Sequence, residues 1–377
     1  MADATGTAAE SGVEKKRERL RRTRHALQAA RGRLSKRALH LIGFVVFVIL
    51  FLKLIPGFEK ALTDLQNVSL GWVVAAMAVE TLSEIGYVVS WRGILDPDSL
   101  LRQDGRGKHL GARVAWAQLG GGMVVPGGTL GSMGVGAVTL HRLGMPMEKV
   151  GERQFTLMFL NSAVDGLAIV FFGLGLAIGV FRGEDNLALT LLPAALVAIG
   201  IALALFVSGR AERLVERLER KRPRVAKGVS TLASAVENTR DMLRHRGSAK
   251  IVLGAIAYLG FDMLVLQGAF VAIDAHPVPT FAVVSMCYLI GGLAGSIPLP
   301  ANLGAVGGMT GMLIVFGIDH NEAVAAVVLY QAIGFLVPLI GGAIAYLFLR
   351  REFGSMPEEG DDEPSAGAGG GAPQPAG

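Results

Sequence analysis

The apolar residues of this chain are gathered into runs about as long as a helix needs to cross a bilayer. A helix rises about 1.5 Å per residue, so roughly 20 apolar residues cover a hydrocarbon core of ~30 Å. Polar segments separate these runs, which indicates a protein that crosses the membrane several times. We expect about six full spans, at residues 38–55, 70–91, 154–181, 187–208, 251–273 and 321–349.

Two further apolar stretches are each interrupted near the middle by proline and small residues. Proline removes a backbone donor and breaks or kinks a helix, so each stretch is predicted to turn back as a re-entrant helical hairpin. Two short spans joined by a turn are the alternative, since hydropathy does not separate the two arrangements. The interrupting residues are Pro126, Gly127 and Gly128 in the first stretch, and Pro298, Pro300 and Asn302 in the second.

Lysine and arginine are concentrated in segments that the positive-inside rule assigns to the cytoplasm. If each interrupted stretch enters and leaves on one side, all of these segments lie together. The first hairpin then opens to the cytoplasm, and the second opens outward beside Asp274 and His276. We therefore expect a multi-pass protein of the cell (plasma) membrane with cytoplasmic N- and C-termini. The basic segments are residues 1–37, 92–113 and 209–250, and the pair Arg350 and Arg351.

The two interrupted stretches share one order of features. GGMVVPGGTLG is followed by a glycine-rich run and LGMPMEKV, while GSIPLPANLG is followed by GAVGGMTG and FGIDHNEA. One span links the unit at about residues 70–181 to the unit at about 251–349, so the units face opposite ways. Broken helices in such inverted repeats meet near the midplane. The predicted fold is an all-α polytopic membrane protein in which two re-entrant hairpins form an inverted repeat.

Composition agrees with this pattern. Of the 377 residues, 51% are hydrophobic and 18% charged, and the mean hydropathy is +0.48, which leaves too little polar surface for a soluble domain. The membrane domain is predicted to cover residues 38–351, after a basic cytoplasmic segment at residues 1–37. Residues 352–377 are acidic and then rich in Gly, Pro and Ala, so we expect a disordered tail.

The basic segments have two interpretations. They are either plain positive-inside anchors or surfaces that bind the anionic headgroups of membrane lipids. They contain few aromatic residues, so no nucleic-acid partner is expected.

Carboxylates occur inside three predicted spans. Glu80 and Glu84 lie four residues apart in one span, Asp262 lies at a similar depth in the matching span of the other unit, and Asn161 and Asp165 form a second pair. A charged group at such depth costs free energy and normally faces a partner or a wet cavity. The pattern indicates a polar cavity that binds a cationic headgroup or protons. Structural hydrogen bonding between helices is the alternative.

Two arginines flank the mouth of the first hairpin. Arg142 and Arg153 are candidates for contact with a lipid phosphate, although arginines at a cytoplasmic edge also serve simply as topology determinants. The half-helices that begin after Pro126 and Pro300 offer free N–H groups and a positive dipole end, which suit a phosphate.

Motifs of enzymes and metal sites are missing from the sequence. It holds one cysteine, scattered histidines without ligand spacing, no G-x-x-x-x-G-K-[ST] and no G-x-S-x-G. We therefore predict no enzymatic activity, no cofactor and no metal.

The segment IPLPANLGAVGGMTGMLIVFGIDHNEAVAAVVLYQAIGFLVPLIGG resembles the signature of the lysylphosphatidylglycerol synthase transmembrane-region family, which comprises flippase-like integral membrane proteins. The resemblance extends over roughly residues 38–351. Gly304 ends the family's P-x-P-G-G-x-G pattern, and Tyr330 stands in its L-Y-R pattern. The chain departs from the family where Asn302 replaces a glycine and Gln331 replaces the arginine; Ala301 replaces another glycine, and Gly307 a glutamate.

The resemblance implies a lipid flippase or translocator, with an aminoacyl-phospholipid or a polyprenyl-linked sugar as candidate cargo. Larger members of the family carry a soluble aminoacyl-transferase domain, and we expect that domain to be absent because the tail after Arg351 holds no foldable sequence. A small-solute or ion-coupled secondary transporter of the same architecture is the alternative function. An intramembrane transferase, for which no catalytic constellation is evident, and a structural membrane subunit are the other classes.

Overall fold

The computed structural model describes residues 68–96, 109–124, 129–142, 144–183, 186–219, 222–244, 247–296 and 303–353. Every regular element within these ranges is a helix, which confirms the predicted all-α class. The predicted first span, both proline-centred breaks, the basic N-terminus and the acidic tail lie outside the described residues.

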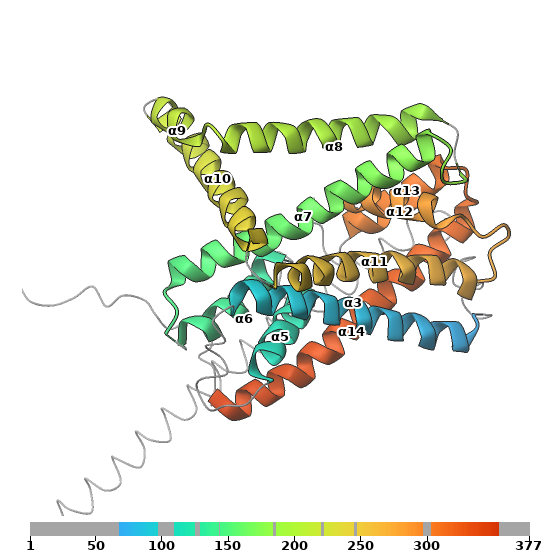
Figure 1. Ribbon diagram of the computed structural model, residues 1–377. Coiled ribbons are helices and arrows are strands. Elements are labelled where there is room, and N and C mark those ends of the chain that lie inside the picture. The colour runs from blue at the N-terminus through green and yellow to red at the C-terminus, as the bar shows by residue number, and fades with distance from the viewer. Residues whose placement is uncertain are drawn as a thin grey trace, which may run out of the picture.

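Long apolar helices form the body of the protein (Figure 1). Five helices of the described ranges are long and apolar enough to cross a membrane, which confirms a multi-pass membrane protein. Each agrees within a few residues with a predicted span at one end or both. They are α3 (Leu70–Leu95), α7 (Met147–Ala177), α8 (Leu187–Ser208), α11 (Ser248–Ala272) and α14 (His320–Phe353).

Shorter helices flank the two breaks. The first pair, α5 (Leu110–Val124) and α6 (Thr129–Arg142), and the second pair, α12 (Phe281–Gly292) and α13 (Leu303–Val315), each pack against each other. A short 3-10 helix, Leu293–Ser296, extends α12. The longest of the four, α5 with 15 residues, rises only about 22 Å, which is less than a ~30 Å core requires.

Helices α3 and α11 pack along each other in opposite directions (Figure 1). Ser83 Oγ donates to the carbonyl of Tyr258 at 2.6 Å, and Ser90 Oγ donates to that of Ile251 at 2.8 Å. Gly86 and Gly254 meet between these contacts. A Cβ built on Gly86 would lie 2.7 Å from the Gly254 oxygen, so only glycine permits this approach.

A second close crossing joins α5 to α14. A Cβ on Gly120 would lie 2.7 Å from the Cα of Gly342, and a Cβ on Gly342 would lie 2.5 Å from the Cα of Gly120. Helix α12 packs against α7 as well as against α11. Both units therefore contribute helices to the same interior.

The basic segment at residues 209–250, for which no helix is predicted from the sequence, is helical over most of its length. It forms α9 (Ala211–Glu219) and α10 (Pro223–Arg244), and α10 packs against α7 and α8. Asn238 Nδ2 donates to Glu152 Oε1 on α7 at 2.8 Å. The apolar residues of α9 recur at helical spacing between charged ones, a pattern that is typical of an amphipathic surface helix.

Candidate functional site

Two carboxyl groups of α3 are buried within the bundle. Glu80 and Glu84, one helical turn apart, expose only 4% and 3% of their surfaces. Glu80 Oε2 and Glu84 Oε2 have no hydrogen-bond partner among the described residues. An unpartnered polar oxygen is costly at such a position, so both side chains need a further partner.

A third carboxyl group reaches the same place from the other unit. Asp262 of α11 interacts electrostatically with Glu80 and with Glu84, and the two glutamates interact with each other. Asp262 Oδ1 also has no hydrogen-bond partner among the described residues. We call Glu80, Glu84 and Asp262 the carboxyl cluster.

Tyrosines from the second unit hold Asp262. The hydroxyl of Tyr288 on α12 donates to Asp262 Oδ2, and Tyr330 on α14 forms a further side-chain hydrogen bond with Asp262. The two rings pack edge to face with their centroids 5.9 Å apart. The predicted site residue Tyr330 is therefore in direct contact with the cluster.

Two other tyrosines lie on the side of Glu84. Tyr87 of α3 and Tyr258 of α11 stack at a tilt, with ring centroids 5.4 Å apart, and both interact electrostatically with Glu84. Gln118 of α5 donates from Nε2 to the Tyr87 hydroxyl at 3.1 Å, and its amide pairs with that of Gln154 on α7. Polar contacts thus extend from the cluster toward α5 and α7.

The remaining neighbours of the cluster are an acid and a glycine. Asp165 of α7 interacts electrostatically with Asp262. A Cβ on Gly334 of α14 would lie 3.7 Å from Glu80 Oε1, so Glu80 faces α14. Asn161 is half-buried one turn before Asp165 and forms no hydrogen bond with the cluster in the described part of the chain.

The structure separates the predicted arginines from this cluster. Arg142 is exposed at the end of α6. Arg153 Nη1 donates to the carbonyl of Leu95 at 3.0 Å, which satisfies a carbonyl at the end of α3. Gly304 is half-buried in the first turn of α13. The predicted site residues Pro126, Gly127, Gly128, Pro298, Pro300 and Asn302 lie outside the described residues.

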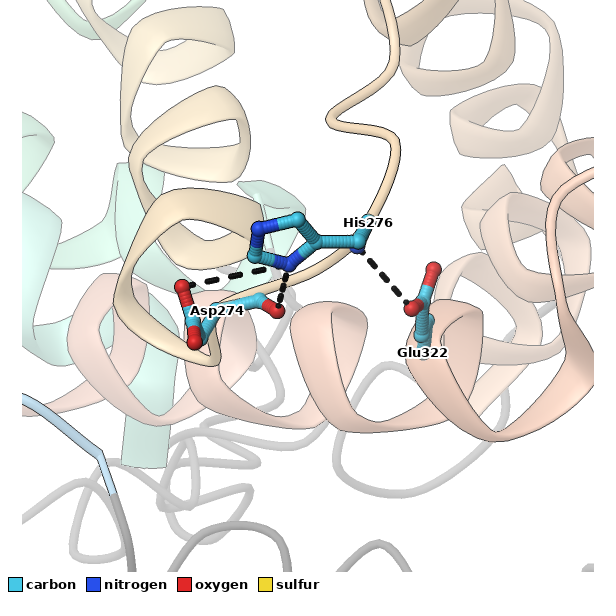
Figure 2. Close-up of polar contacts among 3 residues, drawn as sticks. All are labelled: Asp274, His276 and Glu322. Atoms are coloured by element: carbon cyan, nitrogen blue, oxygen red, sulfur yellow. Dashed lines mark hydrogen bonds and ion pairs between the residues drawn. The ribbon is translucent and has the colours of Figure 1, made fainter.

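A surface contact joins Asp274 and His276, in the loop after α11, to Glu322 of α14 (Figure 2). The backbone N–H of His276 donates to Glu322 Oε1 at 3.2 Å, and His276 Nδ1 lies 2.7 Å from the Asp274 carbonyl. The contact ties the loop between α11 and α12 to the first turn of α14. His276 and Asp274 are exposed, so this contact is separate from the buried cluster.

The carboxyl cluster consists of acids, and its closest polar neighbours are tyrosine hydroxyls. No ion pair within the described ranges involves its carboxyl groups, and no group of three or more His, Cys, Asp or Glu side chains there is arranged to hold a metal ion. Cys287 is buried in the hydrophobic core. Such an arrangement suits a cationic group or protons.

The family model of the lysylphosphatidylglycerol synthase TM region matches residues 40–342. The chain belongs to this family. The match includes the whole of α3 and α11 and most of α14, so the cluster lies within the family region. Membership in the lysylphosphatidylglycerol synthase transmembrane-region family supports a membrane function related to lipids or to transport. No match was found among curated proteins.

Sequence reasoning found the acids of the site but missed Tyr87, Tyr258, Tyr288 and the Gln118 amide. Together with Tyr330, these tyrosines are four of the protein's five. Tyrosine in membrane proteins is enriched at the water interface, and all four lie well inside predicted apolar stretches. Their depth was the available signal.

Proposed function

We propose that this protein is a translocator that moves a phospholipid or polyprenyl-linked lipid across the bilayer, with the carboxyl cluster as the site for its headgroup. The observation that carries the proposal is the convergence of Glu80, Glu84 and Asp262, each with an oxygen that lacks a partner among the described residues. These acids lie inside helices long enough to span a membrane. Carboxyl groups at such depth favour a transport pathway.

An inverted repeat supports this proposal. Each proposed unit consists of a long helix, two short helices and a second long helix, in the order α3, α5, α6, α7 and α11, α12, α13, α14. The antiparallel packing of α3 on α11 is what such a repeat requires at its centre. The proposed site lies between these two helices, so both units contribute to it.

Matching turns give a second argument for the repeat. Gly144 precedes α7 with φ 93°, and Gly317 precedes α14 with φ 83°. The N–H of Met145 bonds to the Leu140 carbonyl at 3.1 Å, and that of Ile318 bonds to the Leu313 carbonyl at the same distance. The two helix ends thus use one C-terminal motif at equivalent positions.

In the proposed mechanism, the headgroup passes through the interior while the apolar tails stay in the lipid. A cationic headgroup would complete the unpartnered carboxyl oxygens, so these acids favour an aminoacyl-phospholipid over a polyprenyl-linked sugar. The N-termini of α6 and α13, which follow the two breaks, suit the lipid phosphate. We assign no catalytic step to the protein.

We also propose a plasma-membrane location with the basic ends of the helices in the cytoplasm. Arg92 at the end of α3, Lys250 at the start of α11 and Arg350 at the end of α14 support this orientation. The arginines of α9 and α10 are suited to bind anionic headgroups on that side.

The proposal is tested with the full-length protein in liposomes that contain a fluorescent phosphatidylglycerol, either esterified with lysine or free. We expect the protein to speed movement of the lysine ester between leaflets, as measured by loss of fluorescence to a quencher added outside. The double variant E80Q/E84Q should slow this movement by at least about tenfold, since each 1.4 kcal/mol of lost interaction is a factor of ten. Glu148, exposed in the first turn of α7, provides the control E148Q.

A small-solute or ion-coupled transporter is the alternative, because buried acids between two units would serve it equally well. This alternative would replace our proposal if the protein carried a labelled small solute while lipid movement stayed no faster than in empty liposomes.

A further inference from the structure

The carboxyl cluster gathers negative charge without a visible counter-charge. Glu80, Glu84 and Asp262 interact with one another inside the protein. Asp165 on α7 adds a fourth acid that interacts with Asp262. No lysine, arginine or histidine of the described residues forms an ion pair with any of them. Because burial and mutual repulsion both disfavour ionised acids, these groups need bound protons or another cation when no cargo is present.

The groups that face the cluster from each packed helix are acids, hydroxyls or amides. Tyrosine hydroxyls donate to a carboxylate but bring no positive charge to it. These neighbours are Tyr87 on α3, Tyr258 on α11, Tyr288 on α12, Tyr330 on α14 and Asp165 on α7, with Gln118 of α5 behind Tyr87.

The surroundings of the cluster favour protons over a metal cation. Glu80 and Glu84 lie inside the continuous helix α3, and Asp262 lies inside α11, where backbone carbonyls are already used in helical hydrogen bonds. A sodium or calcium ion needs several oxygen ligands at once, often from unwound backbone. Among the described residues, no set of three or more His, Cys, Asp or Glu side chains is arranged to hold a metal ion. A proton needs only one carboxyl oxygen.

We propose that the carboxyl cluster exchanges protons for the cationic group of the cargo, so that the protein is a proton–lipid antiporter. When the cation arrives from the cytoplasmic side, a carboxyl O–H bond breaks, the proton passes to cytoplasmic water and the carboxylate pairs with the cation. When the cargo leaves on the outer side, the same oxygen takes a proton from outer water. In each step one positive charge replaces another at the same oxygen. Each cycle therefore carries a proton inward and a lipid outward, so an inward proton gradient drives the lipid outward. This inference rests on the proposed lipid translocation.

The first test measures transport by the wild-type protein and needs no variant. Liposomes hold the full chain, the lysine ester of fluorescent phosphatidylglycerol and a pH-sensitive dye in the lumen. The relevant protein molecules are those whose basic helix ends face the lumen. For these, an acidic outer solution should speed movement of the ester to the outer leaflet several-fold, and the lumen should become more acidic. A protonophore should abolish the acceleration. The free phosphatidylglycerol, which lacks the ammonium groups, should cause no proton movement.

The second test measures proton release on binding in detergent. Titration of the protein with the lysine ester in two buffers of different ionisation enthalpy gives the number of protons released. We expect release from wild type and from E148Q, and a loss of release in E84Q and D262N. Y288F removes a donor to Asp262 but keeps all of the acids, so this variant should still release protons.

The outcomes separate the two proposals. Lipid movement that is equally fast with and without the pH gradient, with no proton released on binding, overturns the antiport and leaves the translocator standing. Movement that follows a sodium gradient in place of the pH gradient also overturns it. Absence of lipid movement under every gradient overturns the translocator, and the exchange with it.

Discussion

At the scale of single residues, the proposed site gathers buried acids that are costly for a membrane protein to place together. Glu80, Glu84 and Asp262 each leave an oxygen without a partner among the described residues. Such groups cost free energy in the folded state, and they persist where function requires them. Tyr288 and Tyr330 reduce that cost for Asp262 alone.

We predict that E84Q is at least as stable as the wild type while it transports far less. Glutamine keeps the shape of the side chain and removes a buried, repelling acid, so the midpoint of thermal unfolding in detergent should not fall. Lipid movement in liposomes should fall by about tenfold or more. A variant that unfolds several degrees lower and still transports at the wild-type rate would indicate that Glu84 only stabilises the bundle.

We predict a graded effect for the tyrosines that hold Asp262. Y288F removes the hydroxyl that donates to Asp262 but keeps the ring contact with Tyr330. A lost hydrogen bond to a charged group costs about 1.5–3 kcal/mol, so transport should fall by roughly tenfold to a hundredfold. Y346F on the same helix as Tyr330 is the control, because Tyr346 is exposed and distant in register. Equal activity of Y288F and wild type would show that the hydroxyl does not orient Asp262 for transport.

At the scale of elements, the pairing of α3 with α11 brings the acids together. Serine hydroxyls and the crossing of Gly86 and Gly254 determine the register of these two helices. The crossing lies about half a turn from Glu84. A change in spacing here would therefore move Glu84 relative to Asp262.

We predict that G254A destabilises the protein and G260A does not, although both lie on α11. The Cβ of an alanine at position 254 would lie 2.8 Å from the Gly86 carbonyl oxygen, whereas at position 260 nothing lies within 4 Å. Overpacking typically costs about 1–3 kcal/mol, while replacing an unrestricted helical glycine gains up to about 1 kcal/mol. Unfolding midpoints in a detergent titration measure both. Equal midpoints would contradict the close crossing.

The two helix-end glycines give a prediction for the proposed repeat. Gly144 and Gly317 have positive φ and no atom within 4 Å of a built Cβ, so alanine there is strained only through the backbone. G144A and G317A should each lower the free energy of unfolding by about 1–2 kcal/mol. G311A, in α13 with open space around its Cβ and ordinary helical φ, is the control. Clearly different losses at the two positions would argue against equivalent turns.

At the scale of the whole molecule, the proposed orientation requires the two hairpins to open on opposite sides. Met147 is exposed at the start of α7, shortly after the first predicted hairpin, and Val278 is exposed just before α12. Cys287 is the single cysteine of the sequence, so its replacement by alanine gives a background without thiols.

We predict that M147C and V278C, each in this background, react from different sides. A membrane-impermeant maleimide should label V278C in intact cells and M147C only in inverted vesicles, because each loop is water-exposed on one side. Labelling of both positions from the same side would remove the inverted repeat and, with it, the shared interior site.

The sequence by itself predicted the fold class, the five long apolar helices of the described ranges and the family. Hydropathy is a local property, because whether a segment crosses a bilayer depends on its own side chains and length. The glycines at the turns before α7 and α14 stand in the matching segments LGMPMEKV and FGIDHNEA, and a glycine with positive φ depends on local backbone sterics. Local charge likewise indicated that Glu80, Glu84 and Asp262 were unusual.

Only the tertiary structure decided which of these residues meet. Glu84 and Asp262 are far apart in the chain, and their approach depends on the faces that α3 and α11 turn toward each other at Gly86 and Gly254. The tyrosines around them come from four different helices. Hydropathy does not indicate how each helix is rotated about its axis, so it does not predict which side chains face one another. The packing of α10 against α7 and α8 is likewise a tertiary contact, which the basic charge of residues 209–250 does not indicate.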